Sequence, residues 1–216
     1  AVGLITYMRT DSVHLADEAV RDIRDFIAER YGKDMVASSV RAFKTKTKNA
    51  QEAHEAIRPT DIRKHPDLIK SYLSAEQFKL YSLIWKRTIA CQMIHATINT
   101  VAIDLGCGEG NTIRATGSTI VNPGFIKVYQ EGIDDAKAAP DSNEKLLPAL
   151  KIGDSVDLTQ IRPEQHFTEP PSRYSEASLI KKLESEGVGR PSTYAPTIAT
   201  LSNRTYVSIE KKQIIP

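Results

Sequence analysis

The spacing of hydrophobic and polar residues divides the chain into three stretches. After a short opening strand, apolar residues up to about position 92 recur every three or four places, which is typical of amphipathic helices. Between residues 93 and 165 apolar and polar residues alternate, as in half-buried strands. From 166 to 216 the helical spacing returns. The pattern predicts an α+β multidomain chain, with a helical domain at 1–92, a β-rich segment at 93–165 and a helical segment at 166–216.

The first stretch contains two predicted long helices. The first helix ends at Gly32, and its apolar stripe consists of Ala16, Val20, Ile23 and Ile27. The second helix begins at a capping box formed by Ser74 and Gln77 and runs to about residue 92. Between them, "QEAHEAIRP" (51–59) predicts a short helical turn that its final proline ends.

Four segments of the middle stretch have the composition of strands, and Gly, Pro and Asn turns separate them. They are 100–105, 112–121, 125–130 and 154–161. So few strands cannot cover one another's apolar side chains. We therefore expect this region to need partner strands from elsewhere.

The last stretch predicts a helix, a glycine turn, a second helix and a strand. Ser175 caps the first helix and Gly187 ends it. Pro191 opens the second helix, and "TYVSI" (205–209) predicts a short strand. This order of elements is the outline of a winged helix-turn-helix.

Charge and composition narrow the class of protein only partly. Lys and Arg number 29 against 27 Asp and Glu, so the formal net charge is +2, which neither requires nor excludes a nucleic-acid partner. Two cysteines are too few for a disulfide framework or a four-thiolate zinc site. No apolar run reaches the ~18 residues of a membrane span. These features predict a cytosolic protein, and the missing initiator methionine predicts a piece of a longer one.

The opening segment "GLITYMRTDS" (3–12) places a tyrosine near a basic side chain. If it is extended, Tyr7, Arg9 and Asp11 share one face. A phenol is a weak nucleophile at neutral pH, but a nearby guanidinium favours the phenolate and also binds phosphate oxygens. The pair therefore fits attack on a phosphodiester. Spacing alone fits a half-buried strand tyrosine beside a surface arginine at least as well.

Other polar residues could contribute phosphate-binding chemistry. His54 can donate a hydrogen bond to phosphate or pass a proton, and it lacks the second histidine of a zinc protease motif. The N-termini of the two last helices offer free N–H groups to phosphate. The side chains there are Arg173, Ser175, Arg190, Ser192 and Thr193, and Gly187 lets the backbone approach a ligand. The same residues also suit ordinary caps and turns.

Three motifs together resemble one family. "ITYMRTDS" (5–12), "QEAHEAIRPT" (51–60) and "RYSEASLIKKLESEGVGRPSTYA" (173–195), in this order, are similar to the motifs of bacterial type IA DNA topoisomerases. The resemblance is firm at both ends of the chain, while residues 93–165 match only in outline. Met8 stands where the topoisomerase III branch has a proline.

The resemblance implies roles for the quoted residues. Tyr7 matches the nucleophile that cuts one DNA strand and retains its 5′ phosphate, Arg9 the arginine that positions it, and His54 a histidine near that phosphate. The implied DNA-binding residues are Thr10, Asp11, Arg173, Ser175, Gly187, Arg190, Ser192 and Thr193. The implied activity is ATP-independent relaxation of negatively supercoiled DNA, acting on a single-stranded segment in the bacterial cytoplasm and nucleoid. The implied architecture is a helical active-site domain, a β-rich arch segment and a winged-helix-like DNA-gripping segment.

One part of the family pattern is missing from the sequence. The resemblance implies an N-terminal acidic domain that holds Mg²⁺ and completes the active site, and "DLGCGE" (104–109) does not match its paired aspartates. No metal ligands are therefore expected in this chain, and we expect it to be inactive by itself. The alternatives are a single-strand DNA-binding module without chemistry, and the topoisomerase III or reverse gyrase branch of the family.

Overall fold

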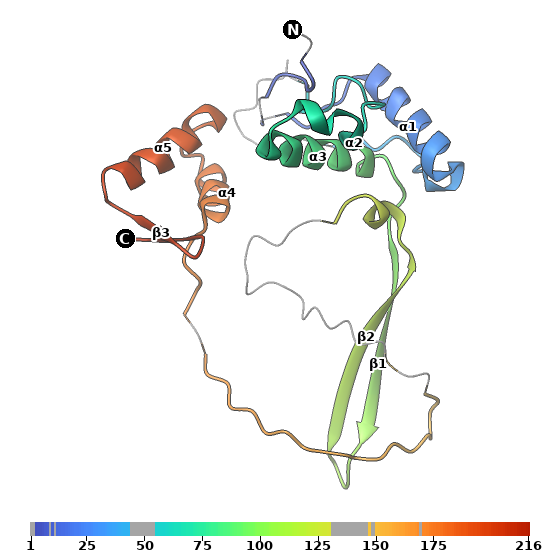
Figure 1. Cartoon of the computed structure of the whole chain (residues 1–216). Coiled ribbons are helices and arrows are strands. Elements are labelled where there is room, and N and C mark those ends of the chain that lie inside the picture. The colour runs from blue at the N-terminus through green and yellow to red at the C-terminus, as the bar shows by residue number, and fades with distance from the viewer. Residues whose placement is uncertain are drawn as a thin grey trace.

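Figure 1 shows a computed structural model of the chain, which describes residues 3–8, 10, 12–43, 55–130, 147, 150–168 and 170–216. Both helices and strands are present, so the chain is α+β. In chain order the elements are α1 (Asp17–Tyr31), η1 (Lys33–Met35), α2 (Pro66–Ile69), η2 (Lys70–Tyr72), α3 (Ala75–Ala90), β1 (Thr97–Gly106), β2 (Thr112–Asn122), η3 (Gly124–Lys127), α4 (Glu176–Glu186), α5 (Pro191–Asn203), β3 (Ser208–Glu210) and β4 (Gln213–Ile215).

The helices α1, α2 and α3 and the segments packed on them form what we call the helical body. Both predicted long helices are confirmed: α1 buries its apolar stripe at Val20, Ile23 and Ile27, and α3 begins at the predicted capping box of Ser74 and Gln77. The capping box pairs N–H groups that the first turn of a helix otherwise leaves unpaired. Both helices therefore form where the sequence places them.

Trp85 on α3 is the centre of the core of the helical body. Its indole is 2% exposed, packs edge-on against Phe26 of α1 with ring centroids 5.8 Å apart, and donates from Nε1 to the Ile62 carbonyl over 2.9 Å. Tyr81, one turn earlier, donates its hydroxyl to the Lys64 carbonyl over 2.7 Å. Burial raises the pKa of Tyr81 to about 12, so this phenol remains a hydrogen-bond donor.

The helical turn predicted for 51–59 is wrong in the part that the structure describes. Residues 55–58 are not helical, and Pro59 forms an antiparallel bridge with Ile5. This segment pairs with the opening residues of the chain instead of closing its own turn. A long-range backbone pairing therefore overrides the local helical pattern.

Two of the four predicted middle strands are confirmed, and they pair as one antiparallel hairpin. Strands β1 and β2 run in register from Ile98↔Ile120 to Gly106↔Thr112, and the directly opposed Asp104 and Arg114 form a two-pronged ion pair at 2.7 and 2.8 Å. Figure 1 shows the hairpin extending away from the helical body. Many of its apolar side chains are exposed: Ile98, Val101, Ile113, Ile120 and Val121.

The other two predicted strands are wrong. Residues 124–127 form the 3₁₀ helix η3, and Phe125 and Val128 pack against the core of the helical body. A separation of three residues brings these two side chains to the same side of a 3₁₀ turn, whereas in a strand they would lie on opposite faces. Residues 154–161 have no assigned secondary structure, because the described part of the chain supplies no strand beside them.

The C-terminal segment has the predicted order of helix, glycine turn, helix and strand, but the strand is Ser208–Glu210 and not the predicted 205–209. Ser175 caps α4, and Gly187 ends it in the left-handed conformation at φ +72°. Tyr194 and Ile198 of α5 are buried, and the Ile214 N–H of β4 donates to the Tyr174 carbonyl over 2.7 Å. None of the helices that the structure describes is long and apolar enough to cross a membrane.

Candidate functional site

Tyr7 lies at the exposed beginning of a loop, directly after a segment that packs on the helical body. Its side chain is 69% exposed, whereas Leu4 and Ile5 are half-buried and pack against the core. We call the segment 7–12 the tyrosine loop; the structure describes its residues 7, 8, 10 and 12, and Thr10 is also exposed. The arrangement presents a phenol to solvent from a backbone that is fixed immediately before it.

The segment before the tyrosine loop is held by residues more than fifty positions later. The Thr6 N–H donates to the Arg58 carbonyl over 2.9 Å, and the Thr60 N–H donates to the Leu4 carbonyl over 3.0 Å. The Thr6 hydroxyl donates to the Ala56 carbonyl over 2.8 Å and accepts the Arg58 N–H over 3.0 Å. Thr6, directly before the tyrosine, is therefore fixed through its backbone and its side chain.

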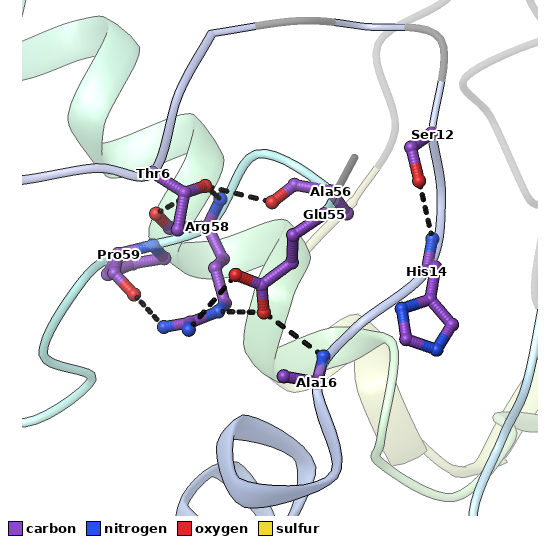
Figure 2. A network of polar contacts seen from close by, with 8 residues as sticks. All are labelled: Thr6, Ser12, His14, Ala16, Glu55, Ala56, Arg58 and Pro59. Carbon is purple, nitrogen blue, oxygen red and sulfur yellow. Dashed lines mark hydrogen bonds and ion pairs between the residues drawn. The ribbon is translucent and has the colours of Figure 1, made fainter. Parts of the chain in front are cut away.

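The segment after the tyrosine loop is held by the same later segment, as Figure 2 shows. The Ala56 N–H donates to the His14 carbonyl over 2.7 Å, and the Ala16 N–H donates to Oε1 of Glu55 over 3.0 Å. The His14 N–H donates to the Ser12 hydroxyl over 3.2 Å. Both ends of the tyrosine loop are thus attached to residues 55–60.

A two-pronged ion pair fixes Glu55 in this arrangement. Arg58 donates from Nε to Oε1 of Glu55 over 2.8 Å and from a terminal nitrogen to Oε2 over 3.2 Å. Its other terminal nitrogen donates to the Pro59 carbonyl over 3.0 Å. The side chains of Arg58 and Glu55 are only 19% and 28% exposed, so the geometry is less open to water than that of a surface pair.

Glu55 is ionised at neutral pH in this environment. Partial burial raises its pKa, but the hydrogen bonds from Arg58 and from the Ala16 N–H, together with the positive charge of Arg58, outweigh burial. The net effect holds the pKa of Glu55 below its usual value. A charged carboxylate accepts stronger hydrogen bonds than a neutral acid.

The sequence motif did not identify the residues of this network. Arg9, Asp11 and His54 lie outside the described residues, and their predicted roles stay predictions. Glu55 and Arg58 belong to the quoted motif "QEAHEAIRPT", for which the sequence predicted only a short helical turn. Only the pairing of distant segments shows that they hold the tyrosine loop.

Arg173 is exposed and lies just before the capped start of α4, the first helix of the C-terminal segment. Ser175 accepts the Ser178 N–H over 3.1 Å, and the Ser175 N–H donates to the Ser178 hydroxyl over 2.8 Å. The hydroxyl of Ser175 therefore serves as an ordinary cap in this structure, while Arg173 stays exposed beside it.

The start of α5 resembles the start of α4: a hydroxyl caps the helix, and the neighbouring arginine is exposed. The Arg190 N–H donates to the Thr193 hydroxyl over 2.9 Å, and Arg190, Ser192 and Thr193 are exposed. A Cβ on Gly189 would lie 3.0 Å from Oγ1 of Thr193, whereas one on Gly187 would meet nothing within 4 Å. The tight turn between α4 and α5 thus needs a glycine at 189 for space as well as for its positive φ.

Among the described residues no group of three His, Cys, Asp or Glu side chains could hold a metal ion. The expectation that this chain supplies no metal ligands stays a prediction. Tyr7 and Glu55 lie in segments attached to the helical body. Arg173 and Arg190 lie at the starts of α4 and α5.

The comparisons with known proteins all point to one family. A family model described as DNA topoisomerase matches residues 1–216. The chain is 51% identical over 216 residues to DNA topoisomerase 1 of Xylella fastidiosa (strain Temecula1), covering all of this chain and 26% of that protein. It is 48% identical to DNA topoisomerase 1 of Helicobacter pylori, covering 99% of this chain and 28% of that one.

A solved structure also resembles the whole chain. The full-length topoisomerase I from Thermotoga maritima matches with a TM-score of 0.74 and 30% sequence identity, over all of this chain and 33% of that one. The chain thus spans about a quarter to a third of the length of these relatives.

Proposed function

The chain belongs to the bacterial type IA DNA topoisomerase family, and we propose that it is the strand-cleaving segment of a longer enzyme that changes DNA supercoiling. Its relatives bearing the name DNA topoisomerase 1 are about four times as long. The segment would therefore work together with further domains of the same protein, in the cytoplasm where bacterial DNA lies.

Tyr7 is the proposed nucleophile. Its phenolic oxygen forms a bond to the phosphorus of one phosphodiester while the bond from phosphorus to the 3′ oxygen breaks. The phenolic proton passes to a base, and the departing 3′ oxygen takes up a proton to become a hydroxyl. Because the tyrosyl ester keeps the energy of the phosphodiester, the 3′ hydroxyl can reseal the strand without ATP after another strand has passed.

The observation that supports this proposal most directly is the setting of Tyr7. The phenol is 69% exposed, so a strand of DNA can reach it, while the residue before it is fixed by three hydrogen bonds to residues 56 and 58. A nucleophile gains rate when its position is fixed before the substrate arrives. A tyrosine serving only the core would be buried.

The remaining roles are proposals that rest on the family motifs. Arg9 and His54 would contact the phosphate that Tyr7 attacks, and Thr10 and Asp11 would contact the DNA beside it. The helix starts at Arg173 and Arg190, with the adjacent Ser175, Gly187, Ser192 and Thr193, would hold the single strand that leads to the site. The Mg²⁺ that the family implies would be bound by a domain outside this chain.

A tyrosine replacement in the full-length protein tests the proposal. Tyr7→Phe should abolish the covalent DNA adduct formed on a single-stranded oligonucleotide while leaving its Kd within about twofold, because only the attacking oxygen is removed. Tyr72→Phe is the matched control, since Tyr72 is 83% exposed on the same helical body. Mass spectrometry of the trapped adduct identifies the modified residue.

The opposite outcome has a clear meaning. If the unmodified protein binds single-stranded DNA but never forms an adduct, the chain is a binding module without chemistry. In that case the Arg173→Ala and Arg190→Ala variants should weaken binding and reduce its dependence on salt.

A further inference from the structure

Both ends of the tyrosine loop are held by one network of hydrogen bonds, which Figure 2 shows from close by. The end before the loop is attached through Thr6, and the end after it through the backbone of His14 and Ala16. The attached residues of the other segment, Glu55 to Arg58, are consecutive in the chain. The loop that carries Tyr7 therefore has its ends set at a fixed separation.

Glu55 joins the two sides of this network, because one of its oxygens contacts both Ala16 and Arg58. Oε1 accepts the Ala16 N–H over 3.0 Å and the Arg58 Nε–H over 2.8 Å. The Arg58 backbone in turn donates its N–H to the Thr6 hydroxyl and accepts the Thr6 N–H. A continuous chain of hydrogen bonds thus joins Ala16, Glu55, Arg58 and Thr6.

We infer that Glu55 and Thr6 are positioning residues for the phenol of Tyr7, an inference that rests on the proposed function. Neither side chain needs to touch DNA. Their hydrogen bonds fix the backbone on both sides of the nucleophile, so that the phenolic oxygen meets the phosphate in line with the departing 3′ oxygen. A misplacement of about 1 Å is enough to slow such a step by about a hundredfold.

The arrangement also predicts which replacements damage the network. Glu55→Gln keeps one oxygen acceptor but removes the charge and the second oxygen that Arg58 contacts. Thr6→Val has a similar shape without the hydroxyl, so the Ala56 carbonyl and the Arg58 N–H both lose a partner. Thr6→Ser keeps the hydroxyl and should restore most of what Thr6→Val loses.

Glu29→Gln is the matched control for Glu55→Gln. Glu29 forms a two-pronged pair with an arginine, Arg63, at 2.6 and 3.2 Å. It lies near the end of α1, and within the described residues no hydrogen bond joins it to Thr6, Glu55 or Ala16. Both replacements remove one charge from a bidentate pair, and only one of the two pairs holds the loop.

The experiment measures single-turnover adduct formation on a saturating single-stranded oligonucleotide, its Kd, and amide hydrogen exchange of the peptide covering residues 3–16, all in the full-length protein. Glu55→Gln and Thr6→Val should slow adduct formation about tenfold to a hundredfold, leave Kd within about twofold, and speed exchange at Ala16. Thr6→Ser should recover most of the rate, and Glu29→Gln should match the unmodified protein.

Three results would overturn the inference. They are an unchanged rate in Glu55→Gln, a rate loss matched by an equal loss of binding, and an unchanged exchange at Ala16. Failure of the proposed function looks different, because the unmodified protein would then form no adduct at Tyr7. The exchange measurement would still decide whether Glu55 and Thr6 hold the loop.

Discussion

Replacing Gly124 by alanine should weaken the junction between the helical body and the hairpin. Gly124 lies two residues after the end of β2 and has φ +46°, a conformation that residues with side chains rarely adopt. A Cβ built there lies 2.4 Å from the His95 carbonyl oxygen and 2.6 Å from the Ala96 nitrogen. Both neighbours are backbone atoms, so neither can rotate away as a side chain would.

The magnitude follows from two separate contributions. Placing a side chain at positive φ costs about 1–2 kcal/mol, and forcing extra atoms into a packed contact costs about 1–3 kcal/mol. We therefore expect Gly124→Ala to cost about 2–5 kcal/mol of local stability. Gly108→Ala, in the hairpin turn, should cost only about 1–2 kcal/mol, because its φ of +71° is also positive but nothing lies within 4 Å of its Cβ.

Amide hydrogen exchange at Phe125 measures this difference. The Phe125 N–H donates to the Ile94 carbonyl over 3.0 Å and exchanges only when the junction opens. Gly124→Ala should speed that exchange by at least about 30-fold, the equivalent of 2 kcal/mol, while Gly108→Ala should leave it nearly unchanged. If both variants behave alike, the close approach to His95 is not the reason that a glycine stands at 124.

Three further predictions concern the helical body. Trp85→Phe removes the donor to the Ile62 carbonyl and should lower the free energy of unfolding by about 1–3 kcal/mol in urea; an unchanged midpoint would mean that this bond contributes nothing. Burial lowers the pKa of His65 from 6.5, so its stabilisation is complete above that value and is lost as pH falls through the lower folded-state pKa. The urea midpoint should drop as pH falls below about 6.5, and less in His65→Asn. The pKa of Glu55 is lowered from 4.5, so its contribution is complete above that value and is lost as pH falls through the folded-state pKa. Glu55→Gln should therefore show a smaller acid-induced drop in stability than the unmodified protein, measured by the same urea titration.

The helices could be predicted from the sequence because their signals are local. The stripe of α1, the capping box of Ser74 and Gln77, and the αL glycine after α4 each act within a few residues. The hairpin was also predictable, since alternating residues separated by glycines specify two strands. Prediction failed at Phe125, whose partners lie in the helical body and not in a neighbouring strand.

The proposed nucleophile lies in a motif that the sequence shows directly, but the contacts that hold its segment could not be predicted. Tyr7 belongs to that motif, and its role stays a prediction, whereas Thr6 and Arg58 are hydrogen-bonded across 52 positions and Ala16 and Glu55 across 39. No periodic pattern connects such distant positions. The sequence at 51–59 even favours a helical turn, and the pairing with the opening residues outweighs that preference.

The β1–β2 hairpin has a practical consequence for work on this chain by itself. Within the described residues no third strand joins the ladder, so its outer backbone N–H and C=O groups remain available to any extended polypeptide, and apolar side chains such as Ile113 and Val121 lie beside them. Exposed strand edges of this kind pair with strands of other chains and promote aggregation. The 216 residues purified alone should self-associate through this ladder, and lysine substitutions along its exposed strand edges should suppress the self-association.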